Sequence, residues 1–309
     1  MRVVSVSLAC FAVLCSTNTV FAAPLRVVNY NVENLFHPAH DSLKDDLEWT
    51  PEGDRRWSYT RYYRKVENIA RVLTVIGEWG GADVVGLQEV ENAECVKRLC
   101  YTLRRGEYDF VHYESSDRRG IDVAFIYKKA RIDTLSSKAI RVNGERTNGE
   151  SLVTRDILYV CTQVDKKDTI HFFVCHLPSQ RGGKAESEWK RVAAKQVLQG
   201  AIDSVLTANK DAKIIVMGDM NDDELEISGL TDKKMKGEGT HKYQGRWTFL
   251  DHFYVSPATD SISEAHVFDA EWIQEPDEKY MGLKPKRTYS GFQYKNGFSD
   301  HLPIVMDLH

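Results

Sequence analysis

The chain has 309 residues, 42% of them hydrophobic and 28% charged, which is ordinary for a soluble globular protein. The formal net charge of −4 excludes a strong overall attraction to polyanions, although a local basic patch and a nucleic-acid substrate remain compatible with it. The sequence has no linker rich in proline and serine, no low-complexity tract and no internal repeat, so a single domain is favoured.

The first 22 residues have the pattern of a secretory signal peptide. Arg2 precedes an apolar stretch from Val3 to Leu14, and the small residues Ala22 and Ala23 follow a short polar segment. The apolar stretch is too short to span a bilayer comfortably, so a membrane anchor is not expected. The pattern therefore predicts a signal peptide at 1–22, one domain at 23–309, and export to the periplasm or out of the cell.

Four cysteines follow the predicted signal peptide, and their spacing matches no metal-binding motif. Cys95 and Cys100 could form a disulfide in an oxidising compartment. Cys161 and Cys175 lie in apolar runs that are typical of buried thiols. The chemistry of the chain is therefore expected from other residue types.

The first predicted strand begins at Leu25 and ends at an amide and a carboxylate, Asn31 and Glu33. A hydrogen-bonded turn is the simpler interpretation of such a strand end. From Thr60, apolar residues recur every three or four positions and predict an amphipathic helix that ends at Gly77. Aromatic and basic residues around the helix start could contact nucleic acid, but we interpret them as side chains lying along the helix surface.

Next, the apolar residues from Val84 to Leu87 predict a buried strand that ends at Gln88 and Glu89, and a helix capped by Asn92 follows. An antiparallel pair is expected at 108–113 and 121–127. The turn between these two strands carries Arg118 and Arg119. Arginines at a turn can contact a phosphate, although exposed turn arginines are common.

A predicted hairpin of 157–164 and 169–177 ends at His176, ahead of a loop rich in glycine and cations that contains Arg181. A lone histidine at a strand end is usually a surface residue. A histidine followed by a flexible cationic loop is a better candidate for proton chemistry on an anion. A long helix is expected after this loop.

The apolar run from Ile214 to Met217 predicts a buried strand that delivers Asp219 and Asn221 to the end of a sheet. The alternative interpretation is a turn rich in Asp and Asn. Asp251 stands in the middle of an apolar, aromatic strand. Because an unpaired carboxylate there would be costly, we expect Asp251 to have a partner, and orienting a histidine is a common reason for one.

Most of these polar residues, together with the adjacent pair Asp300 and His301, lie where an apolar strand meets a loop. Two histidines, several oxygen donors and no cysteine fit attack of water on a phosphoryl group assisted by magnesium or calcium. Zinc hydrolases would need more histidines at ligand spacing, and the sequence has no His-Glu-x-x-His motif. The patterning alone predicts a mixed sheet with outer helices.

Six short motifs, in this order, resemble the endonuclease/exonuclease/phosphatase superfamily, whose fold is that of deoxyribonuclease I. They are Asn31-Val32-Glu33, Leu87-Gln88-Glu89, His176-Leu177 with Ser179 and Arg181, Gly218-Asp219-Met220-Asn221-Asp222, Leu250-Asp251-His252-Phe253, and Ser299-Asp300-His301. The resemblance spans residues 25–308. It implies an α/β fold, a four-layer α/β/β/α sandwich in which helices flank two mixed sheets, with the site at one rim.

The resemblance also implies which residues bind metal and phosphate. Glu89 would be the main ligand of a divalent metal, helped by Asn31 and Asp300. Mg2+ is the expected ion, with Ca2+ or Mn2+ as alternatives. Arg181, which stands in one of these motifs, and Arg119, from its place at the turn, are the candidates for contact with the substrate phosphate.

Five further residues would carry the chemistry. The resemblance implies that Asp219 and Asn221 position the water or the phosphate oxygens. His301 would act as a general acid or base, oriented by Asp251. His176 would bind or protonate a phosphate oxygen. For the partner of His176 two residues lie in the right region, and the choice between Asp117 and Asp122 stays open.

We therefore predict a secreted, metal-dependent phosphoesterase. An endonuclease or general phosphodiesterase is the leading interpretation, with nucleic acid as the substrate. A lipid- or inositol-phosphate phosphoesterase, similar to a sphingomyelinase or a phosphatase, is the alternative, and a non-catalytic binding module on the same fold is a further one. Neither a stable protein partner nor a membrane is implied.

Overall fold

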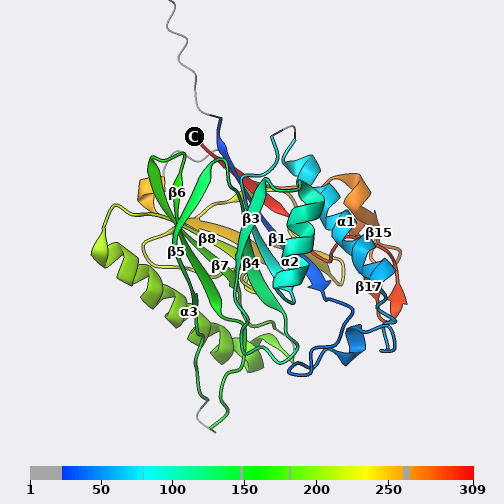
Figure 1. Ribbon diagram of the computed structural model, residues 1–309. Helices are drawn as coiled ribbons and strands as arrows, with labels where there is room; N and C mark the ends of the chain where they lie inside the picture. The colour runs from blue at the N-terminus through cyan, green and yellow to red at the C-terminus, as the bar shows by residue number, and fades with distance from the viewer. Residues whose placement is uncertain (1–22, 79, 147–148, 181, 260–264) are drawn as a thin grey trace, which may run out of the picture.

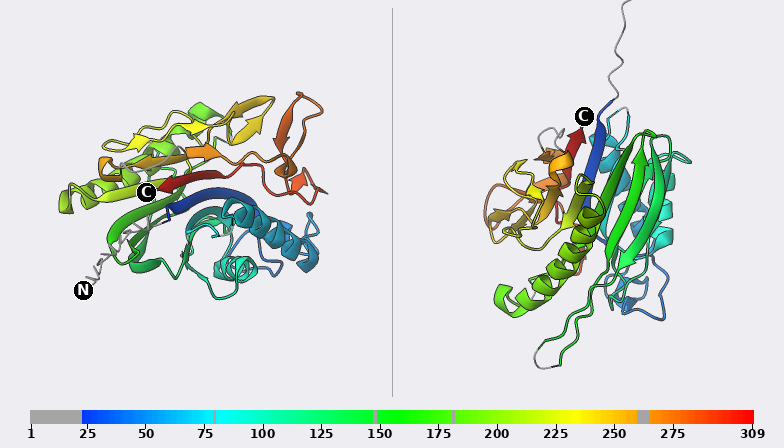
Figure 2. Two further views of the ribbon diagram at one scale, coloured as in Figure 1. Left: turned by 90° about the horizontal axis from the view of Figure 1, so that it is seen from above. Right: turned by 90° about the vertical axis from the view of Figure 1, so that its left-hand side faces the viewer.

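The computed structural model describes residues 23–78, 80–146, 149–180, 182–259 and 265–309 (Figure 1). The predicted signal peptide at 1–22 and the predicted phosphate contact Arg181 lie outside the described residues. Two large sheets form the centre of the molecule, and helices cover their outer faces (Figure 2). The α/β fold with two mixed sheets is therefore confirmed.

The first sheet has seven strands in the described residues, in the order β10-β14-β19-β1-β2-β4-β3. Their bounds are β1 Leu25–Leu35, β2 Val84–Val90, β3 Tyr108–His112, β4 Asp122–Lys128, β10 Met235–Lys236, β14 Ala265–Val267 and β19 Ile304–Leu308. β1 runs parallel to β2 and antiparallel to β19. The predicted antiparallel pair is β3 and β4, which are joined by residues 113–121.

The second sheet has six strands in the described residues, in the order β5-β6-β7-β8-β13-β9. Their bounds are β5 Ile132–Ile140, β6 Ile157–Val164, β7 Asp168–His176, β8 Lys213–Asp219, β9 Thr231–Asp232 and β13 Asp251–Val255. The predicted hairpin is β6 and β7, and β7 then pairs in parallel with β8. The carboxyl ends of β7 and β8 therefore lie side by side.

Three helices flank the sheets in the part of the chain that the structure describes. They are α1 Tyr59–Ile76, α2 Ala93–Leu103 and α3 Lys184–Ala208. The predicted cap of α2 is confirmed, since Asn92 accepts a hydrogen bond from the Cys95 backbone N–H, and Ser58 caps α1 by accepting one from that of Arg61. Such caps satisfy backbone donors that the first turn of a helix leaves unpaired.

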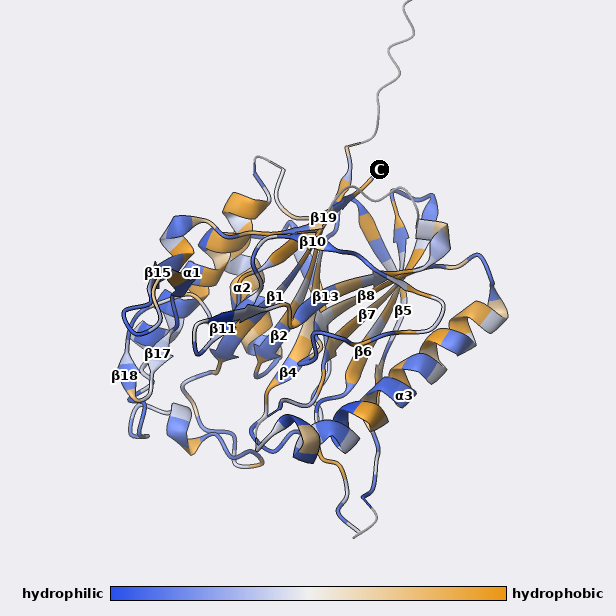
Figure 3. Cartoon of the chain, turned by 180° about the vertical axis from the view of Figure 1, so that it is seen from behind, coloured by the Kyte–Doolittle hydropathy of each residue, from blue (hydrophilic) through white to orange (hydrophobic). Residues whose placement is uncertain are grey.

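Two apolar cores fix the order of the layers. The larger one joins α1 and α2 to the first sheet and fills the space between the sheets, where the Phe125 and Phe172 ring centroids lie 5.1 Å apart. The smaller one joins Leu198 and Ile202 of α3 to Ile214 and Val216 of the second sheet. Apolar residues accordingly concentrate in the central strands (Figure 3). The result is the predicted α/β/β/α sandwich.

Short elements complete the fold outside the two large sheets. They are the pairs β11 His241–Tyr243 with β12 Arg246–Thr248, β15 Gln274–Pro276 with β16 Leu283–Pro285, and β17 Tyr289–Ser290 with β18 Gln293–Tyr294, and the 3-10 helices Leu47–Trp49, Pro257–Thr259 and Glu271–Ile273. None of the helices of the described residues is long and apolar enough to cross a membrane.

Two expectations need correction. Asp251 is the first residue of β13 and not the middle of a strand, because the chain leaves β12 at Thr248 and turns. The Thr240 hydroxyl accepts the backbone N–H of Leu250 and Asp251 at this turn. Cys95 and Cys100 do not form a disulfide. Both are free, buried thiols of α2.

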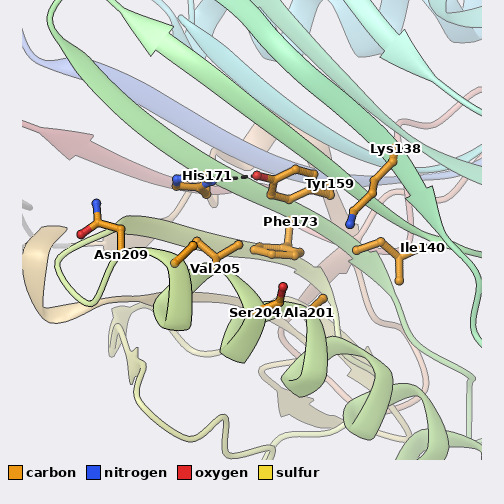
Figure 4. Close-up of a pocket in the computed structure, with 10 residues that line it drawn as sticks. Lys138, Ile140, Tyr159, His171, Phe173, Ala201, Ser204, Val205 and Asn209 are labelled. Carbon is orange, nitrogen blue, oxygen red and sulfur yellow. Dashed lines mark hydrogen bonds between the residues drawn. The ribbon is translucent and has the colours of Figure 1, made fainter.

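A cavity of about 260 Å³ lies between α3 and the outer face of the second sheet. Figure 4 shows Tyr159, His171 and Phe173 of the sheet facing Val205 of the helix across it. The Tyr159 Oη and His171 Nδ1 atoms are hydrogen-bonded at 2.8 Å. None of the residues predicted to form the site lines this cavity, so it is separate from the chemistry described next.

Candidate functional site

The candidate site forms where strand ends of the two sheets face each other. The register of the second sheet places His176 of β7 and Asp251 of β13 on either side of Asp219, the last residue of β8. Two hydrogen bonds join the sheets, from Asn31 Nδ2 to Asp219 Oδ2 at 3.0 Å and from Asn29 Nδ2 to Asp251 Oδ1 at 3.3 Å. Residues from separate segments of the sequence therefore meet at one rim of the sandwich.

Backbone irregularities direct several of these side chains. A bulge in β2 between Gln88 and Val90 contains Glu89, whose φ is 64°. A matching bulge in β1 contains Glu33 with a φ of 51°, and Asn221 after β8 has a φ of 50°. Each left-handed non-glycine residue costs about 1–3 kcal/mol and persists only where the surrounding structure compensates. Such strain is typical of functional sites.

Gly218 explains why a glycine precedes the first carboxylate of its motif. Its φ is 155°, and a Cβ atom at this position would lie 2.1 Å from the carbonyl oxygen of Cys175 in β7. No side chain can occupy that space, so glycine lets β7 and β8 approach each other just before they end. The close approach sets His176 beside Asp219.

His301 is held by a buried carboxylate. Its Nδ1 lies 2.7 Å from Asp251 Oδ2, and its Nε2 lies 3.7 Å from Asp219 Oδ2. Burial lowers the pKa of His301, but the negative charges of Asp251 and Asp219 outweigh it and raise the pKa well above its ordinary value. The imidazole is therefore charged at neutral pH, and the carboxylate on Nδ1 fixes the orientation of Nε2.

Asp219 lies at the centre of the site. Its side chain accepts hydrogen bonds from Asn31 Nδ2 at 3.0 Å and from the Asn221 backbone N–H at 2.9 Å. Burial and the negative charge of Asp251 raise the pKa of Asp219 to about 7. Together they outweigh His301 and the two hydrogen-bond donors, which lower this pKa. A carboxylate of this kind can exchange a proton near neutral pH.

His176 faces the same carboxylate from the other side, with Nε2 3.6 Å from Asp219 Oδ2 and 3.9 Å from Glu89 Oε1. Its Nδ1 is buried and has no hydrogen-bond partner among the described residues. Burial lowers the pKa of His176 well below its ordinary value, and the positive charges of Arg155, Arg119 and His301 lower it further. This imidazole is therefore neutral.

The expectation that Asp117 or Asp122 pairs with His176 is wrong for both residues. Asp117 Oδ2 instead lies 3.4 Å from Nη1 of Arg155, a buried arginine whose Nη2 donates to the Leu177 carbonyl oxygen at 3.0 Å. Asp122 accepts a hydrogen bond from the Ser115 backbone N–H. The chain thus places a cation, and no carboxylate, behind His176.

The family model described as "Endonuclease/Exonuclease/phosphatase family" matches residues 26–233 and 226–309, and thus nearly all of the described chain. The chain belongs to the endonuclease/exonuclease/phosphatase family. Members of this family are phosphoesterases, which are hydrolases that act on phosphoric ester bonds. A search of curated protein sequences found no match.

Solved structures of this family share the fold. An endonuclease/exonuclease/phosphatase family protein from Bacteroides thetaiotaomicron is 18% identical with a TM-score of 0.60, covering 92% of this chain and 97% of its own. TDP2 from C. elegans is 15% identical with a TM-score of 0.60, covering 93% and 75%. A mannosyl-6-phosphatase from Bacteroides thetaiotaomicron is 18% identical with a TM-score of 0.59, covering 92% and 99%.

The family typically depends on a divalent metal, and the charges at the rim fit a cation. In the described part of the chain, the only basic side chains within 4.0 Å of the Glu89, Asp219 and Asp251 carboxylates are imidazoles. Carboxylate oxygens are the donors that Mg2+ prefers, and Glu89 and Asn31 supply oxygens from adjacent strands. A hard divalent cation would therefore offset the excess negative charge at this rim.

Asp300, the third predicted metal ligand, already has a protein cation beside it. Arg287 Nη2 lies 2.9 Å from Asp300 Oδ2. Burial raises the pKa of Asp300, but Arg287 and the nearby histidines outweigh it and lower the pKa to about 2. Asp300 also forms a group with His241 and His301 whose ligand atoms all lie within 4.8 Å of one another. A cation bound there would compete with Arg287.

A second charged cluster supports the rim, and the sequence analysis missed most of it. Buried Glu33 accepts hydrogen bonds from Arg287 Nε at 2.9 Å and from the Thr288 backbone N–H at 2.7 Å. Lys65 is fully buried nearby and donates to the Phe298 carbonyl oxygen. Lys65 lies on the apolar face of α1, so a charged residue in that periodic pattern was a usable signal. Arg287 gave no comparable signal.

Of the two predicted phosphate contacts, only Arg119 is described. It lies in the segment between β3 and β4, its side chain is half exposed, and its Nε is 3.8 Å from Asp117 Oδ1. The positive charge of Arg119 lowers the pKa of His176, so Arg119 lies near the site. Asn221 donates through Nδ2 to the Leu177 carbonyl oxygen at 3.0 Å, and this bond ties the end of β8 to that of β7.

Proposed function

We propose that the chain is an exported, metal-dependent phosphodiesterase that hydrolyses phosphate diester bonds, with nucleic acid as its substrate. One observation carries the proposal. Asp219 lies between a charged histidine, His301, and a neutral one, His176, while Glu89 faces the same space. A site that brings a proton donor, a proton acceptor and acidic metal ligands close together suits the hydrolysis of a charged ester.

The side chains have distinct tasks in this proposal. His301 presents a protonated Nε2 and donates a hydrogen bond or a proton to a phosphate oxygen, while Asp251 keeps its ring oriented. Asp219 accepts the proton of the attacking water, since its pKa of about 7 suits a base at neutral pH. Asn221 fixes the position of Asp219 through its backbone N–H.

A bound divalent cation would neutralise the charge that develops on the phosphoryl oxygens. Glu89 and Asn31 would hold it, with Asp300 as a third ligand once Arg287 moves aside. His176 is neutral and can bind a phosphate oxygen through an N–H without adding a charge. Arg119 would steer the substrate anion from the outer edge of the site.

A basic and aromatic surface favours nucleic acid over a small phosphate ester. Arg61 lies over half-buried Tyr294 at 4.5 Å, and Arg55 lies over exposed Phe292 at 5.5 Å. Buried Thr288 precedes these rings in the chain, and its backbone N–H donates to Glu33 of the cluster that supports the rim. Exposed rings beside cations suit stacked bases and phosphates. A sugar-phosphate monoesterase is the second candidate, because a mannosyl-6-phosphatase aligns over 99% of its length.

A hydrolysis assay tests the proposed function directly. Purified protein is incubated with Mg2+, Mn2+ or Ca2+ and with plasmid DNA, RNA, bis-nitrophenyl phosphate, mannose 6-phosphate, inositol phosphates or sphingomyelin. We expect cleavage of DNA or RNA that EDTA abolishes and Mg2+ restores. Turnover of a monoester or a lipid alone would replace the substrate proposal, and turnover of none would favour a binding module.

One substitution separates the metal ligand from its surroundings. We expect Glu89→Gln to lower kcat at least about 100-fold, because it removes a charged ligand without changing the shape of the side chain. Glu188→Gln on the exposed surface of α3 is the matched control and should retain full activity. Full activity of Glu89→Gln would contradict the metal role. For export, an N-terminus at Ala23 in protein recovered from the periplasm or medium is the expected result, and an intact Met1 would contradict it.

A further inference from the structure

A second group of potential ligands lies in the first sheet, at the open end of the β3–β4 pair. Ligand atoms of His112, Glu114 and Asp122 all lie within 4.8 Å of one another. His112 ends β3 and is paired in register with Ala124, so residues 112 and 122 project from the same face of the sheet, and Glu114 follows two residues after the end of β3. Two adjacent strands thus bring one imidazole and two carboxylates together.

Two of these side chains are buried with unsatisfied polar atoms. The His112 side chain is 2% exposed and that of Asp122 is 1% exposed. His112 Nε2 and Asp122 Oδ1 have no hydrogen-bond partner among the described residues. Leaving such atoms buried and unpaired destabilises the fold, and does so more strongly for a charged group. A bound ligand would remove this cost.

The protein cation nearest to this group does not supply the missing contacts. Lys44 Nζ is 4.0 Å from Glu114 Oε2 and donates instead to the backbone oxygens of Ser115 and Asp117. Asp122 Oδ2 accepts a long bond of 3.3 Å from the Ser115 N–H, while Oδ1 has no hydrogen-bond partner among the described residues. The group therefore keeps two carboxylates and one imidazole for a single ammonium, and a cation of higher charge fits it.

We propose that His112, Glu114 and Asp122 bind one divalent cation, with Zn2+ as the best match. Zn2+ takes both imidazole nitrogen and carboxylate oxygen as ligands, and these three side chains would leave one position of a four-coordinate site for water. The His112 Nε2 and Asp122 Oδ2 atoms are 4.0 Å apart. Ligand atoms at zinc bond lengths are about 3.4 Å apart in a tetrahedron, so these two atoms need to approach each other by about 0.6 Å.

The cation would fasten the segment that joins β3 and β4. Glu114 lies near the start of this segment, Asp122 follows its end, and Asp117 between them contacts Arg155 behind His176. The site does not share a residue with the proposed phosphoesterase centre. Binding is therefore expected to stabilise the fold and the position of Asp117, whatever the substrate of the enzyme.

Zinc content and thermal stability test the site without an activity assay. The chain is equilibrated with Zn2+, dialysed, and its zinc measured by mass spectrometry. We expect wild type to retain one equivalent more than either Glu114→Gln or His112→Asn. At a free Zn2+ of 100 Kd, Tm should rise by about 5 °C or more in wild type and by less in both variants. Glu114 is exposed, so Glu114→Gln should fold even if His112→Asn does not.

The control is Glu107→Gln, which removes an exposed carboxylate next to β3 and should retain the wild-type zinc content. Glu89→Gln separates this site from the proposed catalytic one, since its loss of metal should add to that of Glu114→Gln. Equal zinc contents in wild type, Glu114→Gln and a folded His112→Asn would overturn the proposal. That outcome would leave the proposed phosphoesterase function untouched, because no step of it uses these residues.

Discussion

The two histidines of the site differ in what stands behind them. His301 has a carboxylate on Nδ1, Asp251 at 2.7 Å. His176 has an unpaired, buried Nδ1 and the guanidinium of Arg155 nearby. Yet both direct Nε2 toward the same oxygen of Asp219, at 3.7 Å and 3.6 Å. The surroundings of two otherwise similar imidazoles therefore make one of them a cation and leave the other neutral.

This difference arises from sheet register. Asp251 is paired with Asp219 across β13 and β8, so the carboxylate that supports His301 is fixed by backbone hydrogen bonds. His176 of β7 is paired with Asp219 on the other side of β8. The next strand of the sheet is β6, and Arg155 lies just before its first residue. Asp219 thus stands between two histidines whose pKa values are shifted in opposite directions. Such a separation lets one histidine act as a proton donor and the other remain neutral.

The largest expected effect comes from the support of His301. Asp251→Asn removes the charge that holds His301 protonated and oriented, and we expect it to lower kcat by about 10³-fold in the nucleic-acid assay. His176→Gln keeps a hydrogen-bond donor at the neutral position, so it should cost only about 10²-fold. Steady-state kinetics at saturating substrate measure both. Equal losses would show that the two histidines are equivalent.

Folding of these variants is checked by circular dichroism and Tm. Asp251 accepts a hydrogen bond from buried Asn29, and an amide at position 251 can still accept it. We therefore expect a change in Tm of only a few degrees for Asp251→Asn. A variant that unfolds would report on the support of the sheets rather than on His301, so its kinetics would be judged against Asn29→Ala.

The sequence predicted those parts of the site that lie at strand ends. Asn31, Glu89, His176 and Asp219 all follow short apolar runs, and strand polarity brings such ends together. Asp251 was recognised as a residue in need of a partner. Its predicted place in the strand was wrong, because the turn between β12 and β13 contains no residue that is typical of turns. The short strands β9 to β12 and β14 to β18 were largely missed, since two or three residues carry no periodic pattern.

The electrostatic support of the site was not predictable in the same way. Arg155 and Arg287 are separated from His176 and Glu33 by loops, and their roles depend on tertiary contacts that no local pattern encodes. The sequence pointed to a carboxylate partner for His176, and the fold supplies a cation instead. Local patterns thus indicate which groups are functional, whereas their protonation states follow from packing.

A smaller effect is expected from the exposed side of His176. Arg119→Gln removes one of the positive charges that lower the pKa of His176, so that pKa should rise. An exposed charge contributes at most about 1 kcal/mol, so kcat/KM should fall by about five-fold. NMR titration of the histidine and kinetics on the same variant measure both. Arg118→Gln is the matched control, and an identical response of the two variants would contradict a specific role for Arg119.

The smallest effect concerns stability, at a histidine that points away from the site. His252 follows Asp251 in β13, and its Nδ1 lies 3.3 Å from Asp232 Oδ1. Burial lowers the pKa of His252, but Asp232 outweighs it and raises the pKa above its ordinary value. The stabilisation of the fold by the His252–Asp232 pair is complete below the unfolded pKa of about 6.5, and it is lost as pH rises through the folded pKa of His252.

Asp232→Asn should therefore lower the free energy of unfolding by about 1 kcal/mol at pH 6 and by less at pH 9, with kcat unchanged. Urea denaturation at the two pH values measures this, and an equal loss at both would show that the pair acts without charge.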